Sequence, residues 1–73
     1  MNFHCTIRTK DYDYLGIDED LQNALESAIK SLAIHYKINH VEASEWVREA
    51  LGHSASTKFQ DKRGLLLVKC FKN

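Results

Sequence analysis

The first residues of the chain alternate between apolar and polar side chains. The apolar positions are Phe3, Cys5 and Ile7, and the polar positions between them are His4, Thr6 and Arg8. A period of two residues is typical of a β-strand with one buried face, so residues 3–8 are predicted to form such a strand. Residues 9–17 are predicted to be a connection, because their acidic residues and Gly16 favour turns and loops.

A helical period replaces the alternation after residue 17. Apolar residues recur on one side of a helix at Leu21, Leu25, Ala28, Ile29, Leu32 and Tyr36, and Asp18 is the expected N-cap. A second helix is predicted to begin after a cap at Asn39 and to end at Leu51, where Gly52 favours a left-handed stop. Its apolar stripe consists of Ala43, Val47, Ala50 and Leu51, with Trp46 on the flank.

The C-terminal residues 64–71 form a nearly continuous apolar run, which indicates a strand. Turn-like residues at 61–64 favour a hairpin with a short strand at residues 57–60. The predicted order is therefore β-α-α-β, with one further strand if the short one forms. It describes a single α+β domain over residues 1–73, in which two helices pack on one face of a short antiparallel sheet.

The predicted last strand has two apolar faces. Leu66, Val68 and Cys70 lie on one face, and Leu65, Leu67 and Phe71 lie on the other. One layer of helices covers only one face of a sheet, so the second face requires a cover from a partner protein or from a second copy of the chain. Alternatively, Leu65 and Leu67 tuck under the predicted loop at residues 11–17. The alternation itself favours neither interpretation.

The chain carries no net charge, but its charges are unevenly distributed. Residues 18–52 contain seven acidic and three basic side chains (net −4), whereas residues 53–73 contain one acidic and five basic side chains (net +4). Nucleic-acid-binding domains are usually basic overall, because neutralising phosphates supplies most of their affinity. The neutral chain therefore argues against a dedicated nucleic-acid binder, although its polarity could steer a charged partner to one end.

Two cysteines, Cys5 and Cys70, lie near opposite ends of the chain. So few cysteines favour a reducing, cytoplasmic setting. The sequence leaves open whether the two are bonded, since they meet only if the two terminal strands are neighbours. No segment approaches the roughly 20 apolar residues of a membrane-spanning helix, so no membrane partner is expected.

The sequence shows no catalytic or metal-binding spacing. The four histidines form no His-x3-His pair and the cysteines form no Cys-x2-Cys pair. The three glycines are explained as turn or cap residues rather than as a phosphate-binding loop. His4 and Cys5 point to opposite faces of a strand, so they cannot act together as base and nucleophile. We therefore expect a protein that is not an enzyme and that uses no metal and no cofactor.

Residues 43–51, Ala-Ser-Glu-Trp-Val-Arg-Glu-Ala-Leu, resemble the second helix of ribbon-helix-helix repressors and antitoxins. The order strand, helix, helix is also similar to that family. The resemblance implies a dimer in which the N-terminal strands of two chains pair and read the DNA major groove. It would place His4, Thr6 and Arg8 on the base-reading face, and Phe3, Cys5 and Ile7 in the dimer core. The long connection after the first strand and the C-terminal strand depart from the family pattern.

Two functional hypotheses follow. The first is a small regulatory protein, an inhibitor or adaptor, that binds another protein or forms a homodimer. Its expected contact residues are Tyr12, Tyr14, Trp46, Leu65 and Leu67, because aromatic residues at loop or flank positions suit interfaces. The same aromatic residues could instead pack over the sheet and close the core. The alternative function is DNA binding through His4, Thr6 and Arg8.

Overall fold

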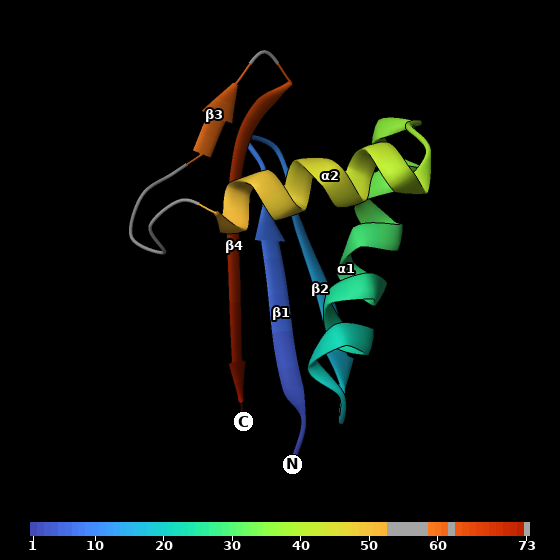
Figure 1. Cartoon of the computed structure of the whole chain (residues 1–73), viewed down its shortest axis with the longest axis vertical. Helices are drawn as coiled ribbons and strands as arrows, with labels where there is room; N and C mark the ends of the chain where they lie inside the picture. Colours follow the sequence, from blue (N-terminus) through green and yellow to red (C-terminus); the bar gives the residue numbers. More distant parts are fainter. Residues whose placement is uncertain (53–58, 62, 73) are drawn as a thin grey trace.

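Six elements make up the described part of the chain, which comprises residues 1–52, 59–61 and 63–72 of this computed structural model. Their order is β1 (Phe3–Arg8), β2 (Asp13–Asp18), α1 (Leu21–Tyr36), α2 (His40–Leu51), β3 (Phe59–Asp61) and β4 (Gly64–Lys72) (Figure 1). β3 contains the second half of the predicted short strand, and residues 57 and 58 of that strand lie outside the described residues.

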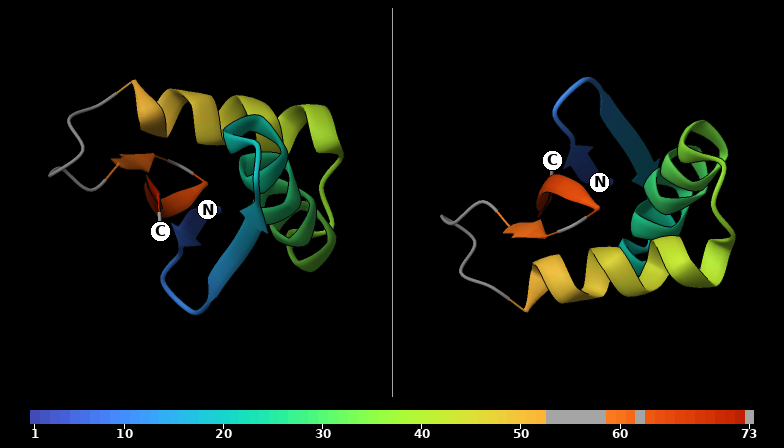
Figure 2. Two further views of the ribbon diagram at one scale, coloured as in Figure 1. Left: turned by 90° about the horizontal axis from the view of Figure 1, so that it is seen from below. Right: turned by 90° about the horizontal axis from the view of Figure 1, so that it is seen from above.

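The strands form one antiparallel sheet in the order β2-β1-β4-β3. Both helices lie on the same side of this sheet, α1 against β1 and β2, and α2 across β4 (Figures 1 and 2). This confirms the prediction of an α+β domain with two helices on one face of a short antiparallel sheet. The chain ends lie side by side, because Phe3 pairs with Lys72 in the register of β1 and β4.

The main difference from the predicted element order is β2, which occupies most of the expected connection at residues 9–17. A tight turn precedes it. The backbone N–H and the hydroxyl of Thr9 both donate to the carbonyl of Tyr12, at 2.8 and 3.0 Å, and the hydroxyl accepts from the Tyr12 N–H at 3.1 Å. The turn reverses the chain, so β2 runs back along β1 with Tyr14 opposite Ile7.

Gly16 lies in β2 and is not the turn residue expected from the sequence. A Cβ atom at this position would lie 1.9 Å from the carbonyl oxygen of Ala24 and 2.8 Å from the backbone nitrogen of Ala28. Only glycine leaves room for this approach of the α1 backbone to the sheet. Ala24 and Ala28 are themselves small and fully buried. The helix therefore packs directly on the backbone of β2.

The helix ends follow the sequence signals with two differences. Asp20, and not Asp18, caps α1, because its side chain accepts two backbone N–H groups of the first turn at 2.7 and 3.3 Å. Asp18 is instead the last residue of β2. Asn39 caps α2 as predicted and accepts a backbone N–H at 2.7 Å. Gly52 follows α2 in a right-handed rather than a left-handed conformation.

The core lies between the helices and the inner face of the sheet. Its largest fully buried side chains are Trp46, Ile7, Ile29, Leu32, Leu66, Val47 and Cys5. The Trp46 side chain is 1% exposed and packs edge-on against Tyr36, with 5.4 Å between ring centroids. Tyr14 is 9% exposed, and its hydroxyl hydrogen-bonds Nδ1 of His35. Tyr14 and Trp46 are thus core residues and not the exposed contact residues expected from the sequence, because both occupy inward positions of their elements.

Cys5 and Cys70 face each other across β1 and β4 and are joined by a disulfide, with their Cα atoms 4.1 Å apart. The bond connects residues separated by 65 positions in the sequence. It ties the first strand of the chain to the last.

Candidate functional site

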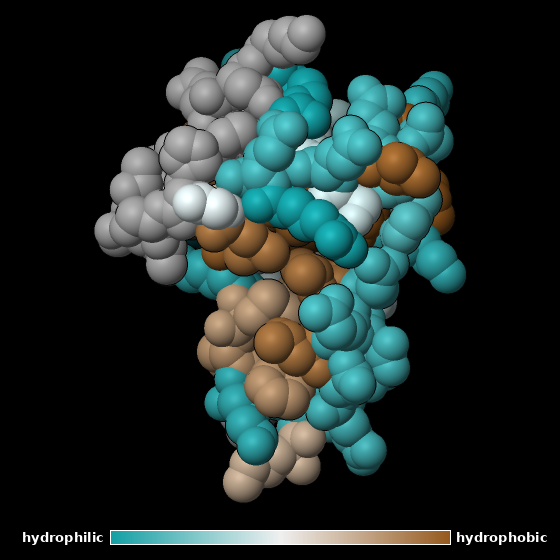
Figure 3. Space-filling view, viewed as in Figure 1, coloured by the Kyte–Doolittle hydropathy of each residue, from teal (hydrophilic) through white to brown (hydrophobic). Residues whose placement is uncertain are grey.

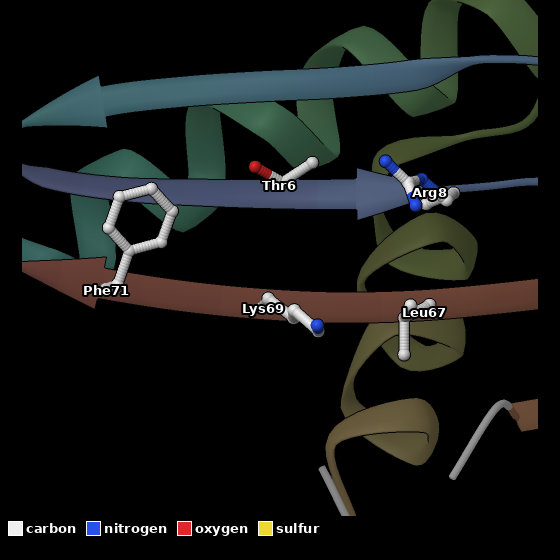
Figure 4. A pocket seen from close by; sticks show the side chains of 5 residues that line it. All are labelled: Thr6, Arg8, Leu67, Lys69 and Phe71. Atoms are coloured by element: carbon white, nitrogen blue, oxygen red, sulfur yellow. The ribbon is translucent and has the colours of Figure 1, made fainter. Parts of the chain in front are cut away.

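The side of the sheet opposite the helices carries nine side chains from three strands. They are Asp13, Leu15 and Ile17 of β2, His4, Thr6 and Arg8 of β1, and Leu67, Lys69 and Phe71 of β4. The strand register places them in rows across the sheet, so that Leu15, Thr6 and Lys69 are neighbours. We call this surface the open face, because both described helices lie behind the sheet when it is seen from this side (Figure 4).

The open face presents large apolar side chains to solvent. Leu15 is 53% exposed, Ile17 is 47% exposed and Phe71 is 54% exposed. Tyr14 and Gly16 alternate with Leu15 and Ile17 along β2. They face the helices and are buried. The side chains of β2 are exposed on one face of the sheet and buried on the other, because the helices form a single layer on one face. These exposed apolar side chains make the open face a candidate contact surface.

A shallow hollow of about 160 Å³ lies on the open face between β1 and β4. It is lined by Thr6, Arg8, Leu67, Lys69 and Phe71 (Figure 4). Thr6 has the smallest of these side chains and lies on the central strand, so its longer neighbours enclose the hollow. The volume is below the roughly 300 Å³ of a typical small-molecule site. It is large enough for a single side chain.

Two cationic side chains line this hollow. Arg8 donates to Asp13 from Nε at 3.0 Å and from Nη2 at 3.2 Å, and this hydrogen bonding raises the pKa of Arg8. Lys69 forms no ion pair with any residue of the described ranges 1–52, 59–61 and 63–72. His4 stacks on Phe71, with 5.3 Å between ring centroids. The open face therefore combines apolar side chains with an ammonium group that is available to a partner.

The structure brings together residues from both functional hypotheses. Leu67, an expected protein contact, lies opposite Arg8 in the register of β1 and β4. Thr6 and His4, which were expected to read DNA, continue the same face along β1. Leu65 is separate, because it lies beyond the part of β4 that pairs with β1 and lines a different hollow. The open face therefore holds all three expected DNA contacts but, of the five expected protein contacts, only Leu67.

The remaining expected contacts do not belong to this surface. Tyr12 is exposed in the turn between β1 and β2, and its ring packs edge-on against His35 at a centroid distance of 4.5 Å. The alternative in which Leu65 and Leu67 tuck under a loop at residues 11–17 keeps only one contact, because Leu65 lines a hollow with Lys10 and Asp11. Leu67 does not lie under this segment. Most of that segment is β2, which lies beside β1 rather than above Leu67.

Sequence analysis missed Leu15, Ile17 and Lys69 as residues of the candidate site. The signal for the first two was present in β2, where they alternate with two buried residues. It was hidden because one of those buried positions is Gly16, which resembles a turn signal when no structure is known. Lys69 was hidden in the apolar run of β4, although its neighbours Leu67 and Phe71 had been placed on the uncovered face.

A second hollow, of about 480 Å³, is lined by Lys10, Asp11, Tyr36, Arg63, Gly64 and Leu65. Arg63 stacks over the Trp46 ring at 5.6 Å and pairs with Glu49, so it also packs against the core. In the part of the chain that the structure describes, no three His, Cys, Asp or Glu side chains are grouped so that they could hold a metal ion. None of the described helices is long and apolar enough to cross a membrane.

The helix side also retains an apolar area, which lies below α2 between α1 and β4 (Figure 3). Phe3 and Cys70 are inward-facing residues at this end of β1 and β4. The Nζ atom of Lys72 lies 5.6 Å from the Phe3 ring centroid, and Cys70 is bonded to Cys5. Contacts within the chain therefore account for part of this area.

The open face is the feature from which a function can be inferred, since comparison with known proteins adds no relative. No family model, no curated protein and no solved structure matches this chain.

Proposed function

We propose that the chain is a non-enzymatic regulatory protein that binds another protein, or a second copy of itself, through the open face. The observation that carries the proposal is the exposure of Leu15, Ile17 and Phe71 on the side of the sheet opposite both helices. Covering each of these half-exposed side chains would contribute on the order of 1 kcal/mol. The hollow beside Thr6 adds a place for one buried anchor residue, which is how many protein interfaces concentrate their binding energy.

DNA binding is the second candidate, and it is favoured by the position of His4, Thr6 and Arg8 on the same face. The ribbon-helix-helix mode requires the first strands of two chains to pair with each other. Here β1 has hydrogen-bonded neighbours on both sides, β2 and β4. DNA binding in that mode would therefore require one neighbour to leave. The ion pair of Arg8 with Asp13 would also have to open before Arg8 could contact a base.

Site-specific photo-crosslinking in cells that contain the protein tests the proposal. A benzophenone amino acid replaces Leu15 on the open face in one variant and Ile34 in the control variant. Ile34 is 73% exposed on α1, so it is a more accessible residue on the other side of the molecule. We expect a covalent protein adduct from position 15 and none of that size from position 34.

The composition of the adduct separates the alternatives. A different protein supports the inhibitor or adaptor form, and an adduct of twice the chain mass supports the homodimer. A nucleic-acid adduct from position 15 would favour the second candidate instead. Equal protein adducts from both positions, or adducts from position 34 alone, would contradict a binding role for the open face.

A further inference from the structure

The dimensions of the open face limit what can cover it. β1 contributes six residues, which span about 20 Å at roughly 3.3 Å per residue. Three strands spaced about 4.8 Å apart give a width of roughly 14 Å, so the flat area is on the order of 300 Å². A stable interface between two globular proteins typically buries about 800 Å² on each partner. The open face alone is therefore small for the rigid docking of two globular surfaces.

One α-helix fits these dimensions. A helix with its side chains is about 10–12 Å wide, and about 13 residues of helix span 20 Å. The opposite side of the same sheet shows this kind of packing, because the 16-residue helix α1 lies over β1 and β2. The open face can accept a second helix and so become the middle layer of a three-layer structure.

The charges on the open face indicate which polar side chains such a helix would carry beside its apolar residues. Among the nine side chains, the carboxylate of Asp13 is held by Arg8 through two hydrogen bonds. Lys69 has no ion-pair partner in the described part of the chain and lines the hollow. A carboxylate from a partner would therefore be attracted to Lys69, next to the position at which an apolar side chain would enter the hollow.

We infer that the open face binds an amphipathic α-helix of another protein, three to four turns long, with an apolar anchor for the hollow beside Thr6 and an Asp or Glu facing Lys69. This inference rests on the proposed function and specifies the partner. Apolar residues at positions i, i+3 or i+4 and i+7 of the helix would face the sheet and cover its exposed apolar side chains and the hollow. The acidic residue facing Lys69 sets the orientation of the bound helix, and helices with a basic residue at that position are disfavoured by repulsion.

Two displayed peptide libraries test the inference on the full chain. The first varies the outward positions of a 16-residue helical framework, and the second varies an extended peptide of the same length flanked by proline. Selection on the wild-type chain is combined with removal of clones that still bind Leu67→Asp. Affinities of the enriched peptides are then measured by fluorescence anisotropy for the wild type and for Lys69→Glu, with Ile34→Asp as the matched control.

We expect the helical library to yield the tighter peptides, with apolar residues at helical spacing and Asp or Glu beside them. Their binding should weaken by about fivefold in Lys69→Glu, the size of one exposed ion pair. Replacing the acidic residues of the peptide with Lys should restore binding to Lys69→Glu and weaken binding to the wild type.

The possible failures have different meanings. If the best peptides depend on Leu67 but are extended, basic or insensitive to Lys69→Glu, the inference is overturned and the proposed function remains. If no peptide from either library binds through Leu67 or Lys69, the inference is overturned, and the proposed function is decided by the adduct from position 15. Circular dichroism shows whether Leu67→Asp is folded. If Leu67→Asp does not fold, Lys69→Glu still decides the test, because a substitution of the exposed Lys69 side chain should leave the fold intact.

Discussion

Cys5 and Cys70 show at the scale of single residues how the fold joins the two ends of the chain. Their disulfide is a consequence of the pairing of β1 with β4, which puts the two residues in register. The sequence indicated that they would meet if the terminal strands were neighbours, but the spacing along the chain could not show that pairing. A bonded pair is more typical of an oxidising compartment than of the cytoplasmic setting expected from the low cysteine count.

Reduction of this disulfide should lower the free energy of unfolding substantially. Closing a loop of 65 residues removes entropy from the unfolded chain worth about 4 kcal/mol. Urea unfolding with and without dithiothreitol measures the difference. Cys70→Ser is the control, since its stability should not respond to the reductant. Identical unfolding curves for the wild type in both conditions would mean that the two thiols are not bonded in solution.

Tyr14 should make stability depend on alkaline pH. Its burial raises the pKa of the phenol, and the nearby Tyr36 raises it further. The folded state therefore keeps the proton where the unfolded chain loses it, so this contribution to stability is complete below about pH 10 and falls as the pH rises above that value. Chemical unfolding between pH 8 and pH 11 should show a smaller decline for Tyr14→Phe. An equal decline for both proteins would contradict this role of Tyr14.

At the scale of elements, β1, α1 and α2 could be predicted because each carries a regular hydrophobic period, and β4 because it is a nearly continuous apolar run. β2 could not, because its period is interrupted at Gly16, whose lack of a side chain serves the packing of α1 and not a turn. The packing of α1 against Gly16 is a tertiary contact, which the local sequence does not show. The missing strand also hid one third of the open face, since Asp13, Leu15 and Ile17 belong to β2.

Gly16→Ala should strongly destabilise the protein. The new Cβ atom would overlap the backbone of α1 at Ala24, so the helix must shift away from the sheet. Overpacking typically costs about 1–3 kcal/mol, and a clash with backbone should reach or exceed the upper end of that range. Gly52→Ala is the matched control, because Gly52 has an ordinary right-handed conformation and a Cβ there, 3.3 Å from the Glu49 carbonyl oxygen, requires a shift of only a few tenths of an ångström. Thermal unfolding of the two variants measures the effect, and equal melting temperatures would contradict the close approach.

At the scale of the whole molecule, both described helices cover one face of the sheet and leave the other face exposed. The sequence predicted an uncovered face from the two apolar faces of β4, and it placed Leu67 and Phe71 on that side. It could not show that His4, Thr6 and Arg8 share that side with Leu67, because this depends on the pairing of the first strand with the last. Tyr14 and Trp46 were expected at the surface because of their loop and flank positions in the sequence, whereas the structure buries both of them in the core.

The most direct test of the open face is a matched pair of charge substitutions, Leu67→Asp on the open face and Ile34→Asp on α1. Binding of each variant to the protein captured through position 15 is measured by isothermal titration calorimetry, or by solution mass if the captured protein is a second copy of the chain. Thermal unfolding confirms that both variants are folded. We predict that Leu67→Asp weakens binding by more than about tenfold and that Ile34→Asp binds like the wild type. A folded Leu67→Asp that binds normally, with the loss appearing in Ile34→Asp, would place the binding surface on the helical side and contradict the account.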